Sequence, residues 1–439
     1  MFGVVWGKGK GNVKRLMLIA LASAILTLLM IATPGCWSAR ELDKRAIVVA
    51  VGIDKAKEPG KLEVSYQIIK PAEVGAPRPA RGGEGQGRGV WVLSTTGDSL
   101  FDAAWKMSNV AGRRPFWGHL RLILFSEALA REGLGPFLDV LARNPMPRRL
   151  AWLAVARGCL ARSILEGYSE LEKVPAETIM GQLEEYGQNS TSLAQTLHGF
   201  LLEMENPGQS PAASAVELVS KGGPSAPNDG ESGDEGSEDV ERGRAGAGGT
   251  KLVPMVRGAA VFKRDRLVGW LDEEETRGLL WVTNRVRGAS IVVDPLAGGR
   301  GKVTLEIVRA RSRIRPEIKG GVPHVTVEIS ASANLAEQAT ASSLYTIEHL
   351  HELERELASA IENEVRMVVT RAQRDLRTDV FGFGLTFYRK HPRQWKAMAE
   401  TWEDAYFPHV EVNLDVNTRL DVSGLIGPAL KRRMTGTGW

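Results

Sequence analysis

Residues 46–53 read AIVVAVGI, a short and continuous apolar run that stops at Asp54. A run of this length without polar alternation predicts a strand that is buried on both faces. Residues 61–70 (KLEVSYQIIK) predict a second strand, and Pro71 ends it because proline has no amide hydrogen to donate within a sheet. These two runs indicate that this part of the chain is built around a β-sheet.

The next hundred residues alternate between short apolar runs and helical stretches. Further strands are predicted over residues 90–95, 120–125 and 150–156. Asp98 is expected to cap a helix that ends near Val110. The buried face of this helix is expected to comprise Leu100, Phe101, Ala104 and Met107. Because strands and helices alternate, the sequence predicts a mixed α/β domain here.

The C-terminal part carries the longest helix and the clearest strand. Residues 343–376 repeat apolar side chains at spacings of three and four, which predicts one long amphipathic helix. Residues 410–422 alternate between apolar and polar side chains, which predicts a strand with one buried face. In the strand predicted over residues 301–315 the apolar face changes phase, so we expect a β-bulge near residues 307–309.

A polar segment divides the chain. Residues 206–252 are dense in Gly, Ser, Pro and acidic side chains, and such a composition buries too little apolar surface to fold. We therefore expect a multi-domain α/β (α+β) protein with mixed sheets and packed helices. The expected divisions are a signal peptide over residues 1–35, an N-terminal α/β domain over 36–205, a disordered linker over 206–252, and one or more C-terminal α/β domains over 253–429.

The first 37 residues have the layout of a bacterial export signal. Basic residues between positions 8 and 15 precede an uncharged apolar run over residues 16–31, and small residues lead to Cys36. The run is short for a membrane span, which needs about 20 residues. We expect cleavage before Cys36 and attachment of a diacylglyceryl group to its thiol. The alternatives are an uncleaved signal anchor, or a cleaved signal followed by an ordinary buried cysteine.

The chain length, the net charge and the cysteines limit the possible classes of function further. A chain of 439 residues suffices for two or three domains. A net charge of +4 over this length gives no argument for nucleic-acid binding, but it suits a position beside an anionic lipid surface. The second of the two cysteines, Cys159, has no disulfide partner if Cys36 carries lipid, so we expect a small buried or capping role for it.

No sequence pattern predicts catalysis. The sequence lacks a nucleophile elbow, a His-Glu-x-x-His metal motif and a phosphate-binding loop followed by Lys-Ser or Lys-Thr. The few histidines and cysteines are scattered rather than clustered. We therefore expect no catalytic residue, no metal site and no cofactor.

One strand carries a row of arginines. Arg309, Arg311, Arg313 and Arg315 share one face of the strand predicted over residues 301–315. They would either bind anions and lipid headgroups or pair with carboxylates of the next strand, such as Glu328.

The 113–119 loop (RRPFWGH) is the best candidate for a partner contact. It joins a predicted helix to a predicted strand and mixes cations with large aromatics, as the centres of interfaces do. The residues proposed to touch a partner are Arg113, Arg114, Trp117 and His119. The alternative is a loop whose aromatic side chains close the core.

With these stretches in place, the chain resembles the Ger(x)C family, the C-subunit lipoproteins of the nutrient germinant receptors of bacterial spores. The likeness covers nearly the whole chain after the signal, and it depends on the order of its motifs rather than on any single one. These motifs are residues 35–42 (GCWSAREL), 52–55 (GIDK), 116–120 (FWGHL), 141–143 (LAR), 258–263 (GAAVFK), 379–384 (DVFGFG), Trp402, and 407–408 (FP).

The resemblance implies a protein of α/β subdomains that is anchored by lipid on the outer face of the inner membrane of the spore. It implies that the protein acts together with a large A subunit and a transporter-like B subunit to sense nutrients. The family has no known catalytic residues that could be assigned to this chain. Whether this subunit itself binds a small molecule stays open.

Two other classes of protein stay open as well. A solute-binding lipoprotein of a transporter would need a cleft between two similar lobes, and an exported enzyme would need a catalytic cluster.

Overall fold

The computed structural model describes residues 10–32, 45–74, 89–143, 149–169, 171–220, 251–294, 302–338 and 347–421. The chain divides into two compact units, residues 1–45 and residues 46–439, and we call the second unit the body. The first unit contains helix α1 (Lys10–Ala32). Within the described residues, no helix is both long and apolar enough to cross a membrane. Cys36 lies outside the described residues, so its lipidation stays a prediction.

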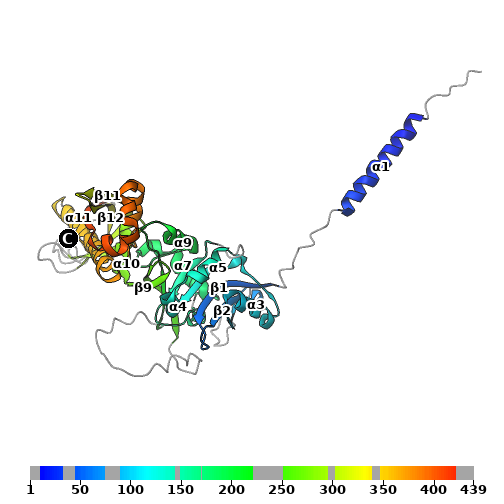
Figure 1. The fold of residues 1–439 in the computed structure, drawn as a ribbon, viewed down its shortest axis with the longest axis horizontal. Helices are drawn as coiled ribbons and strands as arrows, with labels where there is room; N and C mark the ends of the chain where they lie inside the picture. Colours follow the sequence, from blue (N-terminus) through cyan, green and yellow to red (C-terminus); the bar gives the residue numbers. More distant parts are fainter. Residues whose placement is uncertain are drawn as a thin grey trace, which may run out of the picture. The chain divides into compact units, whose positions relative to one another are not determined.

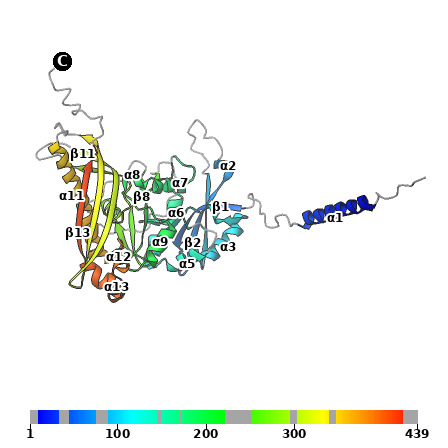
Figure 2. The ribbon, with the colours of Figure 1, turned by 90° about the horizontal axis from the view of Figure 1, so that it is seen from above.

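A large mixed sheet forms the first half of the body (Figures 1 and 2). Its strand order is β3-β2-β1-β5-β6-β7-β8-β9, and the short strand β4 also pairs with β1. The strands are β1 (Arg45–Lys55), β2 (Leu62–Ile69), β3 (Val90–Gly97), β4 (Arg114–Phe116), β5 (Leu122–Ser126), β6 (Trp152–Ala156), β7 (Ala212–Ser220), β8 (Leu252–Lys263) and β9 (Arg266–Leu271). Strands β1, β5, β6 and β7 run parallel, whereas the remaining pairs along this order are antiparallel.

Helices cover both faces of this sheet. One core packs beneath α3 (Leu100–Ala111), α4 (Glu127–Glu132), α5 (Gly135–Arg143) and α9 (Leu197–Glu205). A second core lies on the other face, beneath α6 (Ala161–Leu165) and α7 (Pro175–Glu184). Successive residues of β5 and β6 enter the two cores alternately, which explains why these strands read as continuous apolar runs. The first half also contains α2 (Pro71–Val74), η2 (Trp117–His119) and α8 (Tyr186–Asn189).

The second half is a smaller sheet covered by helices. Its strand order is β10 (Ala289–Val293), β11 (Val303–Lys319), β12 (Val322–Gln338) and β13 (Glu411–Leu420). Gly320 and Gly321 have positive φ angles of 58° and 85°, so a tight turn joins β11 to β12. The first helix is α10 (Glu273–Val282), and the long helix α11 (Ile347–Thr370) continues as the π-helix η4 (Arg371–Leu376). The last helices are α12 (Phe383–Lys390), α13 (Pro392–Met398), η5 (Ala399–Thr401), η6 (Trp402–Tyr406) and η7 (Phe407–His409).

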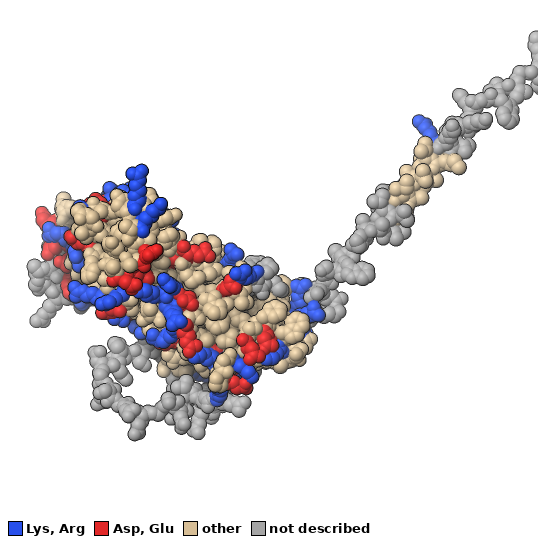
Figure 3. Space-filling model, viewed as in Figure 1, with Lys and Arg blue, Asp and Glu red and all other residues tan. Residues whose placement is uncertain are grey.

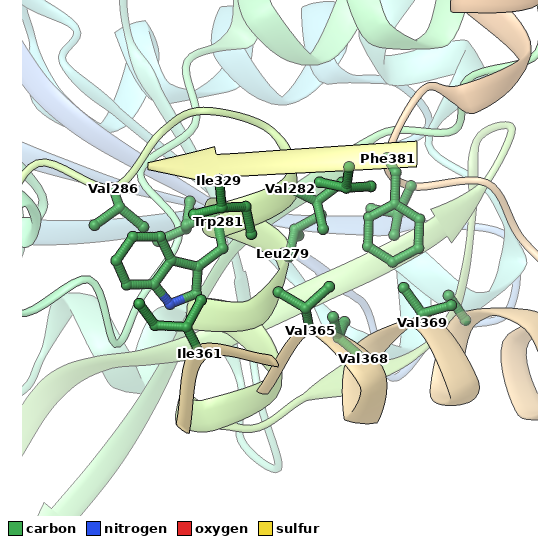
Figure 4. Packing of buried hydrophobic residues seen from close by; sticks show 14 of the residues in the cluster. Leu279, Trp281, Val282, Val286, Ile329, Ile361, Val365, Val368, Val369 and Phe381 are labelled. Atoms are coloured by element: carbon green, nitrogen blue, oxygen red, sulfur yellow. The ribbon is translucent and has the colours of Figure 1, made fainter. Parts of the chain in front are cut away.

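Helices α10 and α11 share one core with the second sheet. Figure 4 shows Leu279 and Trp281 of α10 beside the α11 side chains Ile361, Val365 and Val368, and all of them are buried in one cluster. The predicted amphipathic stripe of α11 is confirmed, since its residues at spacings of three and four enter this core. Side chains of β13 alternate between half-buried and exposed up to Val416, as the sequence pattern predicts. The predicted β-bulge is also confirmed, because the register of β11 against β12 shifts between Ile307 and Arg309.

The linker predicted over residues 206–252 is wrong at its start. Residues 212–220 form β7, which pairs with β6 on one side and β8 on the other. The segment is rich in Ala and Ser, and these small side chains are buried where helices approach the sheet. The boundary at residue 253 also differs, because β8 and β9 belong to the first sheet. Residues 221–250 lie outside the described residues.

The predicted buried face of α3 is confirmed at Met107 and Leu100 and is wrong at Phe101. Ala103 and Met107 are buried, whereas Phe101 is exposed. A Cβ atom on Gly97 would lie 2.6 Å from the backbone nitrogen of Ala103, so the helix and β3 meet at these two small residues. The N-cap is Ser99 rather than Asp98, and its hydroxyl accepts a hydrogen bond from the Asp102 amide. This close approach leaves Phe101 and Trp105 on the outer side of α3, while Met107 points into the core.

Candidate functional site

The 113–119 loop is built on the end of α3 and the side of β1. Helix α3 ends at Gly112, whose positive φ of 62° is typical of a helix C-terminus. The chain then forms β4, which pairs with β1, and the single turn η2. Strand β5 pairs with β1 at residues 50–53 and the Arg121 amide donates to the Val49 carbonyl, so β4 lies beside the first residues of β1. The loop therefore sits where the body begins.

The structure separates the residues predicted for this loop. Arg113, Arg114 and His119 are exposed. Trp117 is half-buried, and its ring meets Tyr66 edge-on at a centroid distance of 5.8 Å. Phe116 meets His119 at 5.6 Å. The loop thus presents its two guanidinium groups outward, while Trp117 packs against the core.

Gly118 is required by this arrangement. A Cβ atom at this position would lie 2.7 Å from the ring of Phe116. Real side chains do not approach so closely, so a residue larger than glycine would displace Phe116 from its contact with His119. The shape of the loop therefore depends on the glycine in its Phe-Trp-Gly-His sequence.

Two exposed aromatic residues lie on α3, the helix that leads into this loop. Phe101 and Trp105 are 67% and 65% exposed, and their rings stack at a centroid distance of 6.4 Å with an angle of 23° between planes. We call Phe101 and Trp105 the aromatic pair. The contact between Gly97 and Ala103 sets the face of α3 on which they lie, and no local sequence pattern signals this contact.

The row of arginines on β11 pairs with carboxylates in part. Arg315 forms an ion pair with Glu328 of β12, and Arg313 lies opposite the same glutamate in the register. This contact supports cross-strand pairing, which was one of the two explanations offered by the sequence.

A buried aspartate organises the 379–384 motif. The carboxylate of Asp379 accepts hydrogen bonds from the amides of Gly382, Phe383 and Gly384 and from the indole nitrogen of Trp402, at 2.7–3.1 Å. Burial raises the pKa of Asp379 to about 7, against the opposing effect of these hydrogen bonds. Helix α12 begins at Phe383, within this motif. These hydrogen bonds occupy the carboxylate, which links the start of α12 to Trp402.

A second buried aspartate joins β1 to α6. Asp54 accepts hydrogen bonds from the amides of Ala161 (2.8 Å) and Arg162 (2.9 Å). Burial raises the pKa of Asp54 to about 6. Gly52 lets the helix approach, because a Cβ atom there would lie 3.1 Å from the Ala161 backbone. The role of this motif is structural as well.

A cavity of about 410 Å³ opens beside α9, α10, β11 and α12. Its charged lining residues are Glu203, Arg285, Arg313 and Arg389. Burial raises the pKa of Glu203. Its carboxylate accepts a hydrogen bond from Gln195 (2.7 Å) and forms an ion pair with Arg285 (3.4 Å). Arg285 also donates to the Ala194 carbonyl (2.7 Å). Glu203 and Arg285 are therefore matched to partners within the protein.

The described residues contain neither a candidate metal centre nor a reactive cysteine. In the described ranges, no three His, Cys, Asp or Glu side chains are grouped so that they could hold a metal ion. Cys159 is half-buried, and its burial raises the pKa of the thiol to about 12, which keeps the nucleophilic thiolate rare. The accessible features of the site are therefore the 113–119 loop and the aromatic pair.

Comparison with known proteins assigns the class. Residues 38–218 match the family described as "Spore germination protein N-terminal domain", and residues 257–424 match "Spore germination B3/ GerAC like, C-terminal". Spore germination protein KC of Bacillus subtilis (strain 168) is 28% identical over 425 residues, covering 94% of this chain and 98% of that protein. Spore germination protein YndF of the same organism is 26% identical and covers 92% and 97%.

A solved structure agrees with the sequence comparisons. The crystal structure of the GerBC protein matches with a TM-score of 0.51 at 19% identity, covering 85% of this chain and 98% of that one. The fold and its relatives define a multi-domain α/β spore germination protein. The chain belongs to the Ger(x)C family.

Proposed function

We propose that this chain is a lipid-anchored, non-catalytic subunit of a nutrient germinant receptor. It is held through Cys36 on the outer face of the inner membrane of the spore and assembles there with an A and a B subunit. The observation that carries the proposal is the end-to-end match to spore germination protein KC, of which this chain covers 98%. The charged head and apolar run before Cys36 support the anchor.

The non-catalytic role is supported by how the buried charges are used. Asp379, Asp54 and Glu203 each bind backbone amides, side chains or arginine within the protein. A catalytic group needs a perturbed pKa and a substrate within reach. These carboxylates have the first property but are occupied by structural partners.

We assign Arg113, Arg114 and His119 to the contact with a partner subunit, with Trp117 supporting the loop from behind. Exposed guanidinium groups can form paired hydrogen bonds with carboxylates of a partner. The alternative class, a solute-binding lipoprotein, has less support, since its two lobes should be alike. The two sheets of the body differ in strand number and order.

The test of the receptor role is the germination response of spores. Spores that lack this chain should stop responding to one group of nutrients and still respond to nutrients sensed by other receptors. Cys36→Ala should reproduce this loss while the body remains folded, because the unanchored chain no longer stays with its membrane partners. A full response of the deletion spores to every nutrient would overturn the proposal. Mass spectrometry of the mature N-terminus reports the lipid on Cys36 directly.

A further inference from the structure

The aromatic pair is placed on α3 where it does not serve the core. Phe101 and Trp105 are four residues apart and therefore lie on one side of the helix, away from the buried Ala103 and Met107. Both side chains keep about two thirds of their surface exposed while they stack on each other. Single exposed apolar residues are ordinary, but two adjoining large aromatics form a patch that signals an interaction.

The packing of α3 does not depend on this patch. The helix is fixed by Ala103 against Gly97, by Met107 in the core, and by the hydrogen bond from the Thr95 hydroxyl to the Ala103 carbonyl (2.9 Å). The exposed surface of the two aromatic rings is therefore available to an occupant outside the body.

The position of α3 points to a membrane as that occupant. The helix leads through Gly112 into β4, which lies beside the first residues of β1, where the chain enters the body. Eight residues separate Cys36 from Arg45, and the nine steps between these two positions span at most about 30 Å when extended. Helix α3 has 12 residues and is about 18 Å long. These two lengths allow Phe101 and Trp105 to reach the surface of a membrane that holds a lipid on Cys36.

The chemistry of the patch fits a lipid interface. Trp and Phe combine large apolar rings with affinity for the headgroup region, and they gather at that depth in membrane proteins. Asp102 on the same helix is neutralised by Lys106 at 2.7 Å, and Arg113 and Arg114 follow the helix. In the space-filling view, uncharged surface reaches the end of the body where Figure 1 draws α3, beside residues of both charges (Figure 3).

We propose that the face of α3 carrying Phe101 and Trp105 inserts into the outer leaflet of the membrane that holds the anchor, and so fixes how the body stands on that membrane. This inference rests on the lipid anchor of the proposed function. One lipid-attached residue allows the body to pivot, whereas a second contact restricts it. The membrane contact of the aromatic pair stops the body from rotating about its anchor. It thereby holds the 113–119 loop close to the membrane, where a partner subunit can contact it.

The experiment uses the full lipid-modified chain in vesicles of phosphatidylglycerol and phosphatidylethanolamine. Phe101→Cys and Trp105→Cys each receive a nitroxide spin label, and its collisions with oxygen and with a water-soluble nickel chelate are compared. Val110→Cys is the matched control, because Val110 is 59% exposed and lies half a turn around α3 from Phe101. Ile347→Cys on α11 is a distant control with 71% exposure. The wild-type chain gives the background from the half-buried Cys159.

The expected result is a ratio of oxygen to nickel collisions several-fold higher at positions 101 and 105 than at 110 and 347. A chain that floats with the vesicles but shows equal ratios at all four positions would overturn the inference and leave the anchor intact. Shielding of 101 and 105 only after A and B subunits are added would assign the face to a protein and also overturn it. A chain that does not float would contradict both the anchor and the lipid contact.

Discussion

Arg277 of α10 and Glu364 of α11 form a buried ion pair that joins the two helices. The Nε of Arg277 lies 3.0 Å from each carboxylate oxygen of Glu364, and the side chains are only 12% and 10% exposed. The indole nitrogen of Trp281 donates to the same carboxylate at 3.0 Å. Gly278 permits this approach, since a Cβ atom there would lie 2.4 Å from the Glu364 carbonyl oxygen. The second half of the body is thus held by a polar contact inside its apolar core.

Glu364→Ala is therefore expected to lower the free energy of unfolding by about 3–5 kcal/mol, because it leaves Arg277 and the Trp281 indole without their acceptor. Denaturant unfolding of the body measures this loss. The control is Glu362→Ala on the same helix, which removes an exposed pair with Arg366 and should cost at most about 0.5 kcal/mol. If both variants lose the same free energy of unfolding, the buried ion pair stabilises the protein no more than the exposed one.

Asp379 makes stability depend on pH. Its folded-state pKa of about 7 lies above the ordinary 3.8, so the folded state keeps a proton that the unfolded state releases. The contribution to stability is full below pH 3.8 and is lost as the pH rises through about 7. The free energy of unfolding of the wild type, minus that of Asp379→Asn, should therefore fall between about pH 4 and pH 7.

Chemical unfolding at several pH values measures this difference, and the contribution of Asp54 cancels because both proteins keep it. Asp404→Asn is the control. Its exposed carboxylate is paired with Lys263, which lowers the pKa of Asp404, so any slope should be small and of opposite sign. A flat difference for Asp379→Asn over this range would mean that its carboxyl group ionises normally in the folded protein.

Gly97→Ala tests the contact that sets the face of α3. The added methyl group would lie 2.6 Å from the Ala103 backbone nitrogen, so α3 must move away from β3. We expect a loss of about 1–3 kcal/mol in the free energy of unfolding, as overpacking typically produces. Gly181→Ala is the control, because a Cβ atom in that helix meets nothing within 4 Å and should be neutral or stabilising. A neutral Gly97→Ala would show that another contact orients α3.

The segment between β7 and β8 gives a test of the corrected boundary. Ser220 pairs with Leu252, so the strands can be joined directly by a two-residue Asn-Gly turn in place of residues 221–251. We expect this shortened chain to melt within a few degrees of the wild type. Deletion of residues 211–249 should instead unfold the first half of the body, because it removes β7 with its buried Ala213, Ala215 and Val216. Similar melting of the two deletions would contradict the sheet order.

Local patterns predicted most of the fold. The period of two in β13, the spacing of three and four in α11 and the phase slip at Ile307 are each properties of a single element. Pairing between distant segments was not accessible in this way. Strand β7 was missed because Ala and Ser are common both in linkers and in crowded sheets, and only its neighbours β6 and β8 distinguish the two.

The candidate site was predicted only in part, because some of its features depend on contacts between distant segments. The exposure of Arg113 and Arg114 follows from their charge, which is costly to bury. The burial of Trp117 depends on Tyr66, which is about fifty residues earlier in the chain. Phe101 was assigned to the core because apolar side chains usually face inward, whereas a glycine–alanine contact across two elements decides the helix face. Such contacts are properties of the assembled fold.

The most direct measurement of the central claim is affinity purification of this chain from spore membranes, followed by identification of the proteins that remain bound. The account predicts that an A and a B subunit co-purify with the wild type, and that Arg113→Ala with Arg114→Ala lowers their yield severalfold while the circular dichroism of the protein is unchanged. Arg143→Ala, at an exposed arginine of α5, should keep both subunits bound. Recovery of the wild-type chain without A and B subunits, or with a transporter permease in their place, would contradict the account.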